Sequence, residues 1–250
     1  MLLTVGGVSA TKPAHATAPP LALDGIGTNT TCQAANCEAQ FLTTTQGYDV
    51  VLLLAECGYT YCPITISSII DSSGLTFTQR VSYTPSDKLW EYYARTTSPL
   101  KSDNITVVFS CISYCFGLHG IQALAIQGAN TRGIFDPSPS IPATCASPTC
   151  DDCTAYDLGT SCSVSIQTST QDFVIAITAI NDAGPCGARL DYQGVQGFTT
   201  LTTNPGYAGN FEIDYAITTT PQNNIVFSCK GTDAWAIVVD AISFRGAFGI

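Results

Sequence analysis

Short apolar runs separated by turn-forming residues dominate the chain. Asp49–Ala55 (DVVLLLA) is a β-favourable run bounded by Gly47 and Gly58, and Asp71–Gly74 has turn chemistry. None of the runs carries a sustained helical period. The pattern therefore predicts a series of strands in the first half of the chain: Asp49–Ala55, Thr65–Ile70, Leu75–Ser82, Trp90–Thr96, Ile105–Ser110 and Ile121–Gln127.

The second half of the chain repeats this pattern. Four pairs of segments match: Tyr93–Pro99 with Tyr215–Pro221, Val108–Cys111 with Val226–Cys229, Ala123–Phe135 with Ala236–Phe248, and Asp49–Ala55 with Asp172–Thr178. The repeat is too long and has too few copies for a solenoid. It predicts a second set of strands: Phe173–Ile180, Gly197–Thr202, Glu212–Thr218, Ile225–Cys229 and Ala234–Phe244.

Many short strands separated by Gly, Pro, Asn and Ser clusters predict an all-β protein. We expect two tandem antiparallel β-sandwich domains of the jelly-roll or immunoglobulin-like kind, at residues 31–138 and 139–250. A proline-spaced segment, Asp136–Ala143, favours extended backbone between them. Residues 1–30 are expected to form an extended N-terminal tail.

Composition narrows the functional classes. Of 250 residues 45% are apolar and only 11% are charged, so we expect a surface rich in Ser and Thr hydroxyls. The net charge of −10 argues against binding to nucleic acid and to anionic membranes. No run reaches the roughly 20 apolar residues that span a bilayer, so membrane insertion is not expected.

Twelve cysteines divide evenly between the halves, which is typical of disulfides formed in an oxidising compartment. A zinc site is the alternative, because Cys150 and Cys153 have C-x-x-C spacing. The chain has only two histidines and no second C-x-x-C, so we favour disulfides and expect no metal or other cofactor. The expected pairs are Cys62–Cys111, Cys186–Cys229, Cys57–Cys115, Cys32–Cys37, Cys153–Cys162 and Cys145–Cys150.

Residues for catalysis are scarce, and no catalytic site is expected. His119 has no acid beside it in the sequence and is interpreted as a loop or packed histidine. Two binding readings remain open. Asp151, Asp152 and Asp157 supply oxygens for calcium or form a polar linker, and a set of aromatic residues stacks on sugars or fills the core: Trp90, Tyr92, Tyr93 and Trp235.

Two N-glycosylation sequons begin at Asn29 and Asn104, and they favour an exported protein that carries covalent glycans. The leading residues are apolar and β-compatible, with Leu2, Leu3, Val5 and Val8 around two small glycines. They have the character of a strand that is donated to a neighbouring subunit. The alternative is the remnant of a signal peptide ending near Ala14-His15-Ala16.

The duplicated segments also carry a resemblance to a known class. Ser73–Arg80 (SGLTFTQR), Trp90–Thr96 (WEYYART), Asn104–Ser110 (NITVVFS) and Ala123–Gly128 (ALAIQG) resemble β-sandwich domains of archaeal secreted surface proteins. The layout is similar to that of thread-like or pilus-like filament subunits. The resemblance implies glycosylation and assembly by insertion of an N-terminal strand into the next subunit.

The sequence therefore predicts an extracellular structural subunit that polymerises with itself. A secreted carbohydrate-binding or adhesive module is the main alternative, and a viral shell protein is a third. An enzyme comes last.

Overall fold

The computed structural model of the chain describes residues 19–32, 36–57, 65–84, 88–110, 119–146, 163–181, 197–205, 210–228 and 233–246. These residues contain sixteen strands and no helix, which confirms the all-β expectation. The strands are β1 (Ala22–Ile26), β2 (Thr28–Thr30), β3 (Cys37–Leu42), β4 (Val50–Cys57), β5 (Thr65–Asp71), β6 (Thr78–Tyr83), β7 (Lys88–Arg95), β8 (Asp103–Ser110), β9 (His119–Gln127), β10 (Ala143–Ala146), β11 (Ser163–Ile166), β12 (Asp172–Asn181), β13 (Thr199–Pro205), β14 (Asn210–Ile217), β15 (Ile225–Ser228) and β16 (Asp233–Ser243).

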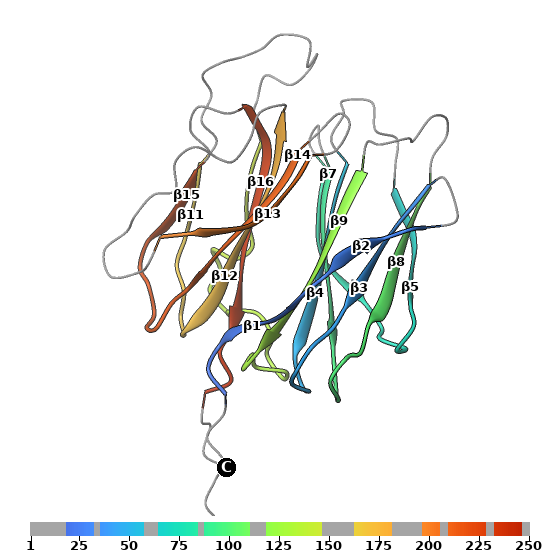
Figure 1. Cartoon of the computed structure of the whole chain (residues 1–250). Coiled ribbons are helices and arrows are strands. Elements are labelled where there is room, and N and C mark those ends of the chain that lie inside the picture. Colours follow the sequence, from blue (N-terminus) through green and yellow to red (C-terminus); the bar gives the residue numbers. More distant parts are fainter. Residues whose placement is uncertain are drawn as a thin grey trace, which may run out of the picture.

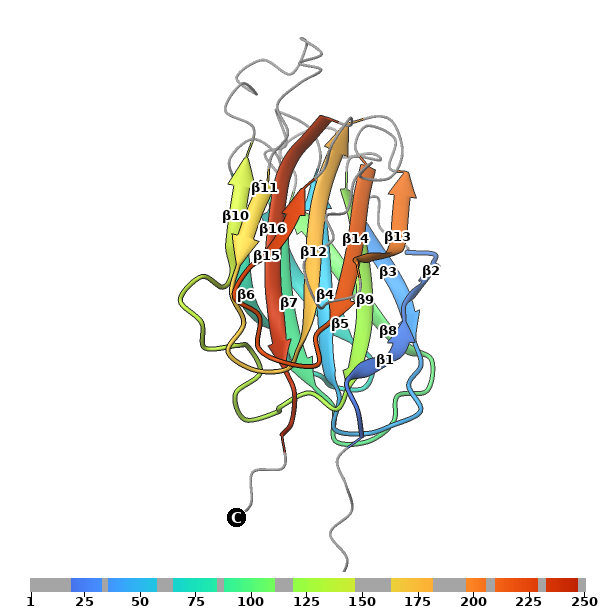
Figure 2. The same ribbon diagram turned by 90° about the vertical axis from the view of Figure 1, so that its left-hand side faces the viewer.

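Antiparallel pairing joins these strands into four sheets (Figures 1 and 2). Central sheet 1 has the order β1-β9-β4-β7-β6, and central sheet 2 has the order β10-β16-β12-β14-β13. Outer sheet 1 has the order β2-β3-β8-β5, and outer sheet 2 is the pair β11-β15. Figure 1 shows β1–β9, which we call the first half, beside β10–β16, the second half.

The four sheets are stacked around three apolar cores. Outer core 1 lies between outer sheet 1 and central sheet 1, and includes Phe109 and Leu53. Outer core 2 lies between central sheet 2 and outer sheet 2, and includes Phe227. The central core lies between the two central sheets, where Leu52 and Ile175 belong to the same cluster. The two halves therefore share one buried layer.

This stacking explains why the longest apolar runs lack the usual alternation. All eight residues of β4 are buried, because both faces of its sheet are covered. Leu52 and Leu54 enter the central core, whereas Val51 and Leu53 enter outer core 1. In β12, Ile175 and Val174 divide in the same way between the central core and outer core 2.

Segments that match in sequence occupy equivalent strands. The matched segments lie on β4 and β12, β7 and β14, β8 and β15, and β9 and β16. The two central sheets also have the same strand order, since β1-β9-β4-β7-β6 corresponds position by position to β10-β16-β12-β14-β13. The duplication therefore extends from the sequence to the topology.

The sequence predicts a tail at residues 1–30, but the last ten of these residues belong to the fold. Leu21 is buried, and β1 pairs with β9 in central sheet 1, so the fold already begins before residue 30. At Gly25 and Gly27 a Cβ atom would collide with Thr43 O and with the Gln40 side chain. Glycine is needed there because the chain crosses from central sheet 1 to outer sheet 1 against other backbone. Both glycines lie within the tail expected from the sequence.

A second difference concerns the strand expected at Leu75–Ser82. The structure has β6 at Thr78–Tyr83, and residues 74–77 are irregular. This segment carries the chain from the edge of outer sheet 1 to the edge of central sheet 1. Its backbone therefore cannot pair along its whole length with either sheet.

The entry, middle and exit of the described chain meet at Gly128. This residue has φ +75°, and a Cβ atom there would collide with the carbonyl oxygens of Pro19 and Pro20, each at 2.6 Å. Its own carbonyl accepts a hydrogen bond of 2.8 Å from Arg245 N. Gly128 follows β9, the last strand of the first half. The segment that leads to the second half is therefore held against both the first and the last residues of the fold.

The shared core predicts that the halves unfold together. Leu52→Ala and Ile175→Ala should each lower the free energy of unfolding by about 2–5 kcal/mol, because each leaves a cavity in the central core. Ile70→Ala, at a side chain that is 58% exposed, should change it by less than about 0.5 kcal/mol. Urea unfolding followed by tryptophan fluorescence and far-UV circular dichroism should give one coincident transition. Separate transitions for the two halves would contradict a shared core.

Candidate functional site

Disulfides are present where the described residues allow them to be seen. Cys32 and Cys37 form a bridge, the local pairing expected from the sequence. Cys57 and Cys145 are also disulfide-bonded, and no described cysteine is free. The other predicted members lie outside the described residues: Cys62, Cys111, Cys115, Cys150, Cys153, Cys162, Cys186 and Cys229. Their pairing stays a prediction.

Both predicted glycosylation sites lie on outer sheet 1. Asn29 is exposed on β2, and its Oδ1 accepts a hydrogen bond of 2.7 Å from Gln40 Nε2. Asn104 lies on β8, where the Thr106 hydroxyl donates to its Oδ1 at 3.3 Å. The predicted donor strand with Leu2, Leu3, Val5 and Val8, and the candidate calcium ligands Asp151, Asp152 and Asp157, lie outside the described residues.

The aromatic residues proposed for sugar stacking differ in burial, because Tyr92 and Tyr93 are half-buried and line the two parts of the groove described below. Trp90 is 4% exposed and belongs to outer core 1, which Tyr92 borders, whereas Tyr93 packs against the central core. The side chain of Trp235 lies outside the described residues. Trp90 therefore fills a core, the second of the two readings.

His119 is a packed histidine. It is 8% exposed, and its ring stacks on Phe109 with the centroids 4.3 Å apart. Its Nδ1 lies 3.1 Å from Glu38 Oε1 on β3, a neighbour that is remote in sequence. The packing of outer sheet 1 on central sheet 1 brings this acid beside it, so sequence proximity was a poor guide.

A polar cluster links the two central sheets. Arg80 on β6 donates from Nε to Asp240 Oδ2 on β16 at 2.8 Å, and from Nη2 to Oδ1 at 3.3 Å. The guanidinium lies 4.1 Å from the centroid of the Phe135 ring. Tyr93 meets the same ring edge-on, with centroids 5.1 Å apart. Burial and the negative charge of Asp240 raise the pKa of Glu91 well above its usual value.

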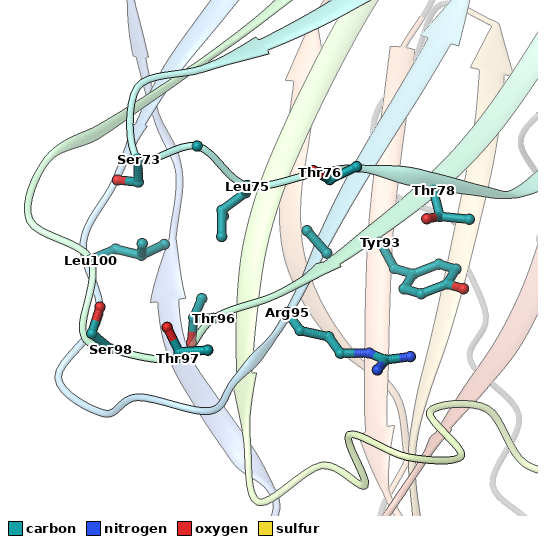
Figure 3. Close-up of a pocket in the computed structure, with 12 residues that line it drawn as sticks. Ser73, Leu75, Thr76, Thr78, Tyr93, Arg95, Thr96, Thr97, Ser98 and Leu100 are labelled. Atoms are coloured by element: carbon teal, nitrogen blue, oxygen red, sulfur yellow. The ribbon is translucent and has the colours of Figure 1, made fainter.

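The candidate functional site is a groove on the open side of the first half (Figure 3). Its larger part has a volume of about 500 Å³ and runs between residues 73–78 and residues 93–100. A second part of about 380 Å³ runs along β5 and shares Leu75 and Thr76 with the first. We call the two parts together the edge groove.

Strand pairing explains why the groove exists. β6 pairs with β7 only from Thr78, opposite Tyr93, onward. Residues 94–97 therefore have β4 on one side and the groove on the other. Among the strands that the structure describes, β5 is the last of outer sheet 1 and pairs only with β8. Backbone edges from two sheets thus border one depression.

The lining of the groove is apolar and hydroxyl-rich. Leu75 and Leu100 reach into it beside Thr96, Thr97 and Ser98, as Figure 3 shows. Ile66, Ile69 and Phe77 line the part along β5. Arg95 is the one charged residue among the described residues of either part. Such a surface suits an uncharged, extended peptide more than an ionic ligand.

Hydrogen bonds hold both walls of the groove, and on one wall the acceptors are carboxylates. Asp103 Oδ1 accepts from Ser73 N at 2.9 Å, and Asp71 Oδ1 accepts from Leu75 N at 2.6 Å. Burial and the neighbouring Asp103 raise the pKa of Asp71 to about 6. On the other wall, Thr96 Oγ1 accepts from Asp49 N at 2.9 Å. The groove is therefore built into the fold.

We searched the described residues for side chains that could bind a metal ion. Within the described ranges, no group of three or more His, Cys, Asp or Glu side chains is placed to hold a metal ion. The same ranges contain no helix that is long and apolar enough to cross a membrane. What the groove offers chemically is backbone hydrogen bonding and apolar contact.

Comparison with protein-family models, curated proteins and solved structures found no match to this chain.

The cluster at the central sheets gives a stability prediction. Arg80→Met should lower the free energy of unfolding by about 3 kcal/mol, because it leaves the fully buried Asp240 without its cationic partner. Arg95→Met removes an exposed arginine from the next strand and should change it by less than about 0.5 kcal/mol. Urea unfolding at pH 7 measures both, and equal effects would show that the ion pair contributes nothing.

Proposed function

We propose that this protein is a secreted structural subunit that polymerises head to tail into an extracellular filament. Each subunit donates the strand around Leu2–Val8 to the edge groove of the next subunit. Disulfides and glycans at Asn29 and Asn104 fit an exported protein of this kind.

We further propose that each half is a jelly roll. From β3 onward in the first half, the chain changes sheet at each step except between β6 and β7: β3 outer, β4 central, β5 outer, β6 and β7 central, β8 outer and β9 central. The late strands return beside the early ones, since β9 lies next to β1 and β8 lies next to β3. Such interleaving is what two Greek keys produce. The second half has the same order in its central sheet, with β15 beside β11.

The observation that carries the filament proposal is the outer edge of β5, which has no partner strand among the residues that the structure describes. Edge strands are normally blunted by lysine, proline or short length, because an open edge recruits another strand. β5 has seven residues, TISSIID, with no charge before Asp71 and no proline. Ile70 on this strand is 58% exposed, and the edge groove lies alongside. A strand added there would extend outer sheet 1.

The leading segment of a second copy suits this position. Leu2, Leu3, Val5 and Val8 supply apolar side chains, and Gly6 and Gly7 allow close approach of backbone. Seven extended residues cover about 23 Å at about 3.3 Å per residue, the length of a strand such as β5. The proline-containing stretch before Leu21 supplies an extended spacer.

Two changes test the proposal from both sides of the contact. Removing residues 1–18, or Ser68→Lys on β5, should leave a folded chain that forms no filaments in negative-stain electron microscopy. Ser82→Lys on the edge strand β6 is the matched control and should polymerise normally. Circular dichroism verifies folding. Filaments of normal length from the truncated chain would refute strand donation.

A mixing experiment separates donor from acceptor. Truncated chain lacking residues 1–18 keeps the groove, so it should cap filaments of the full chain and shorten them. The truncated chain that also carries Ser68→Lys should have no such effect. Equal shortening by both would place the acceptor elsewhere.

A further inference from the structure

A pair of carboxyl groups ties together one end of the first half. Asp24 accepts hydrogen bonds from Thr45 N at 2.8 Å and from Gln46 N at 2.7 Å, and also from the Thr45 hydroxyl. Asp49 lies beside it and is 1% exposed. Within the described residues, neither carboxyl oxygen of Asp49 has an N–H or O–H donor. Its available partner is the other carboxyl group.

The second half has the same arrangement. Asp136 accepts from Ser138 N and Ser169 N, both at 2.7 Å, and from Thr170 N at 3.0 Å. Asp172 lies beside it, fully buried, and its Oδ2 has no donor within the described residues. The two pairs, Asp24–Asp49 and Asp136–Asp172, are called the carboxyl clasps below.

Matching backbone bonds show that the two clasps occupy equivalent places. Asp49 and Asp172 are aligned by the sequence repeat, and each donates its N–H to a threonine hydroxyl, that of Thr96 at 2.9 Å and that of Thr218 at 2.8 Å. In turn, the N–H of Thr96 donates a hydrogen bond to the carbonyl oxygen of Asp49, and the N–H of Thr218 donates one to that of Asp172. A clasp therefore connects three segments in each half.

The chemistry of each clasp requires a proton. Asp49 and Asp172 are buried, and each lies against a second carboxyl group. Both groups of a pair cannot be ionised there, so the buried one stays neutral and donates to the other. Although burial works against it, hydrogen bonds from Thr45 and Gln46 lower the pKa of Asp24. Burial and the charge of Asp24 raise the pKa of Asp49 to about 7. Asp24 is thus the carboxylate and Asp49 the neutral acid.

In the second clasp the group with the raised pKa is Asp172. Burial, opposed by the hydrogen bond from Thr170 and reinforced by the charge of Asp136, raises the pKa of Asp172 to about 7. A cation is a poor substitute for the proton in either clasp. The oxygens of Asp24 and Asp136 already accept hydrogen bonds from backbone N–H groups. A metal ion needs several oxygen ligands around it, and N–H groups cannot serve as such ligands.

We propose that the carboxyl clasps are a duplicated proton-dependent lock, which holds one end of both halves closed in acid and loosens it as the solution becomes alkaline. The clasps lie within one chain, so the lock can be tested on the monomer, without strand donation.

The direction of the effect follows from proton binding. A carboxyl whose pKa is higher in the folded state binds its proton more tightly there, so its stabilisation is complete below the unfolded value of 3.8. It is lost as the pH rises through the folded value of about 7. Between these limits each clasp can raise the unfolding equilibrium constant up to about tenfold per pH unit. Asp71 and Glu91 add to the same trend, so variants are needed to isolate the clasps.

The test is urea unfolding of the full chain between pH 4.5 and pH 8, at concentrations where it is monomeric. In the double variant Asp49→Asn with Asp172→Asn, each amide group donates to the same carboxylate but has no proton to lose. Its stability should match the unaltered chain near pH 5 and fall much less by pH 8. The matched control is Asp24→Asn. It replaces the carboxylate that accepts from Thr45 N and Gln46 N with a weaker, neutral acceptor, so it should destabilise the chain at every pH.

Two results would overturn the proposal. One is a double variant that keeps the full pH dependence of the unaltered chain, and the other is an Asp24→Asn variant that behaves like Asp49→Asn. If the variants fail to fold, infrared spectroscopy of the unaltered chain decides instead. Neutral carboxyl bands should be present at pH 6, should decline by pH 9, and should be missing from the urea-unfolded chain at pH 6. Their absence from the folded chain at pH 6 would refute the lock.

Discussion

The fold depends on burying both faces of the two central sheets. Either half alone would expose its side of the central core, where four side chains meet: Leu52 and Leu54 of the first half and Ile175 and Ile177 of the second. Fully burying such a side chain is worth about 1.5–3 kcal/mol, so the halves are stabilised strongly against separation. The Arg80–Asp240 ion pair fixes the relative position of the sheets, which apolar contact alone specifies weakly. Buried acids then shape the loops at the margins.

The edge groove and the carboxyl clasps are connected through the same loops. Thr96 lines the groove and is bonded to Asp49 of the first clasp. Leu100, on the same wall, donates its N–H to Thr44 Oγ1 at 2.9 Å, one residue before the Thr45 that Asp24 holds. On the opposite wall, Asp71 and Asp103 hold residues 72–75. The shape of the proposed acceptor thus depends in part on Asp49 and Asp71, whose pKa values are raised to about 7 and about 6 by burial and by a neighbouring carboxyl group.

The sequence predicted the strands well where the apolar pattern was local, as at β4, β8 and β12. It also predicted the duplication, because matched segments such as Tyr93–Pro99 and Tyr215–Pro221 occupy equivalent strands. It missed β1, since Asp24, Gly25 and Gly27 have the composition of a turn and their strand depends on pairing with β9. The clasps and the groove were not predictable either. They join residues such as Asp24 and Asp49, or Leu75 and Leu100, that only the folded topology brings together.

The meeting point at Gly128 has a mechanical consequence. Tension on the chain entering at Pro19 acts where the start of β1 lies beside the end of β9, since Ala22 pairs with Gln127. The close packing of Pro19 and Pro20 on Gly128 lies at the same place. The bond from Arg245 to Gly128 connects this place with the last part of the second half. A pull on the entering chain would therefore load both halves at one point, ahead of the packed cores.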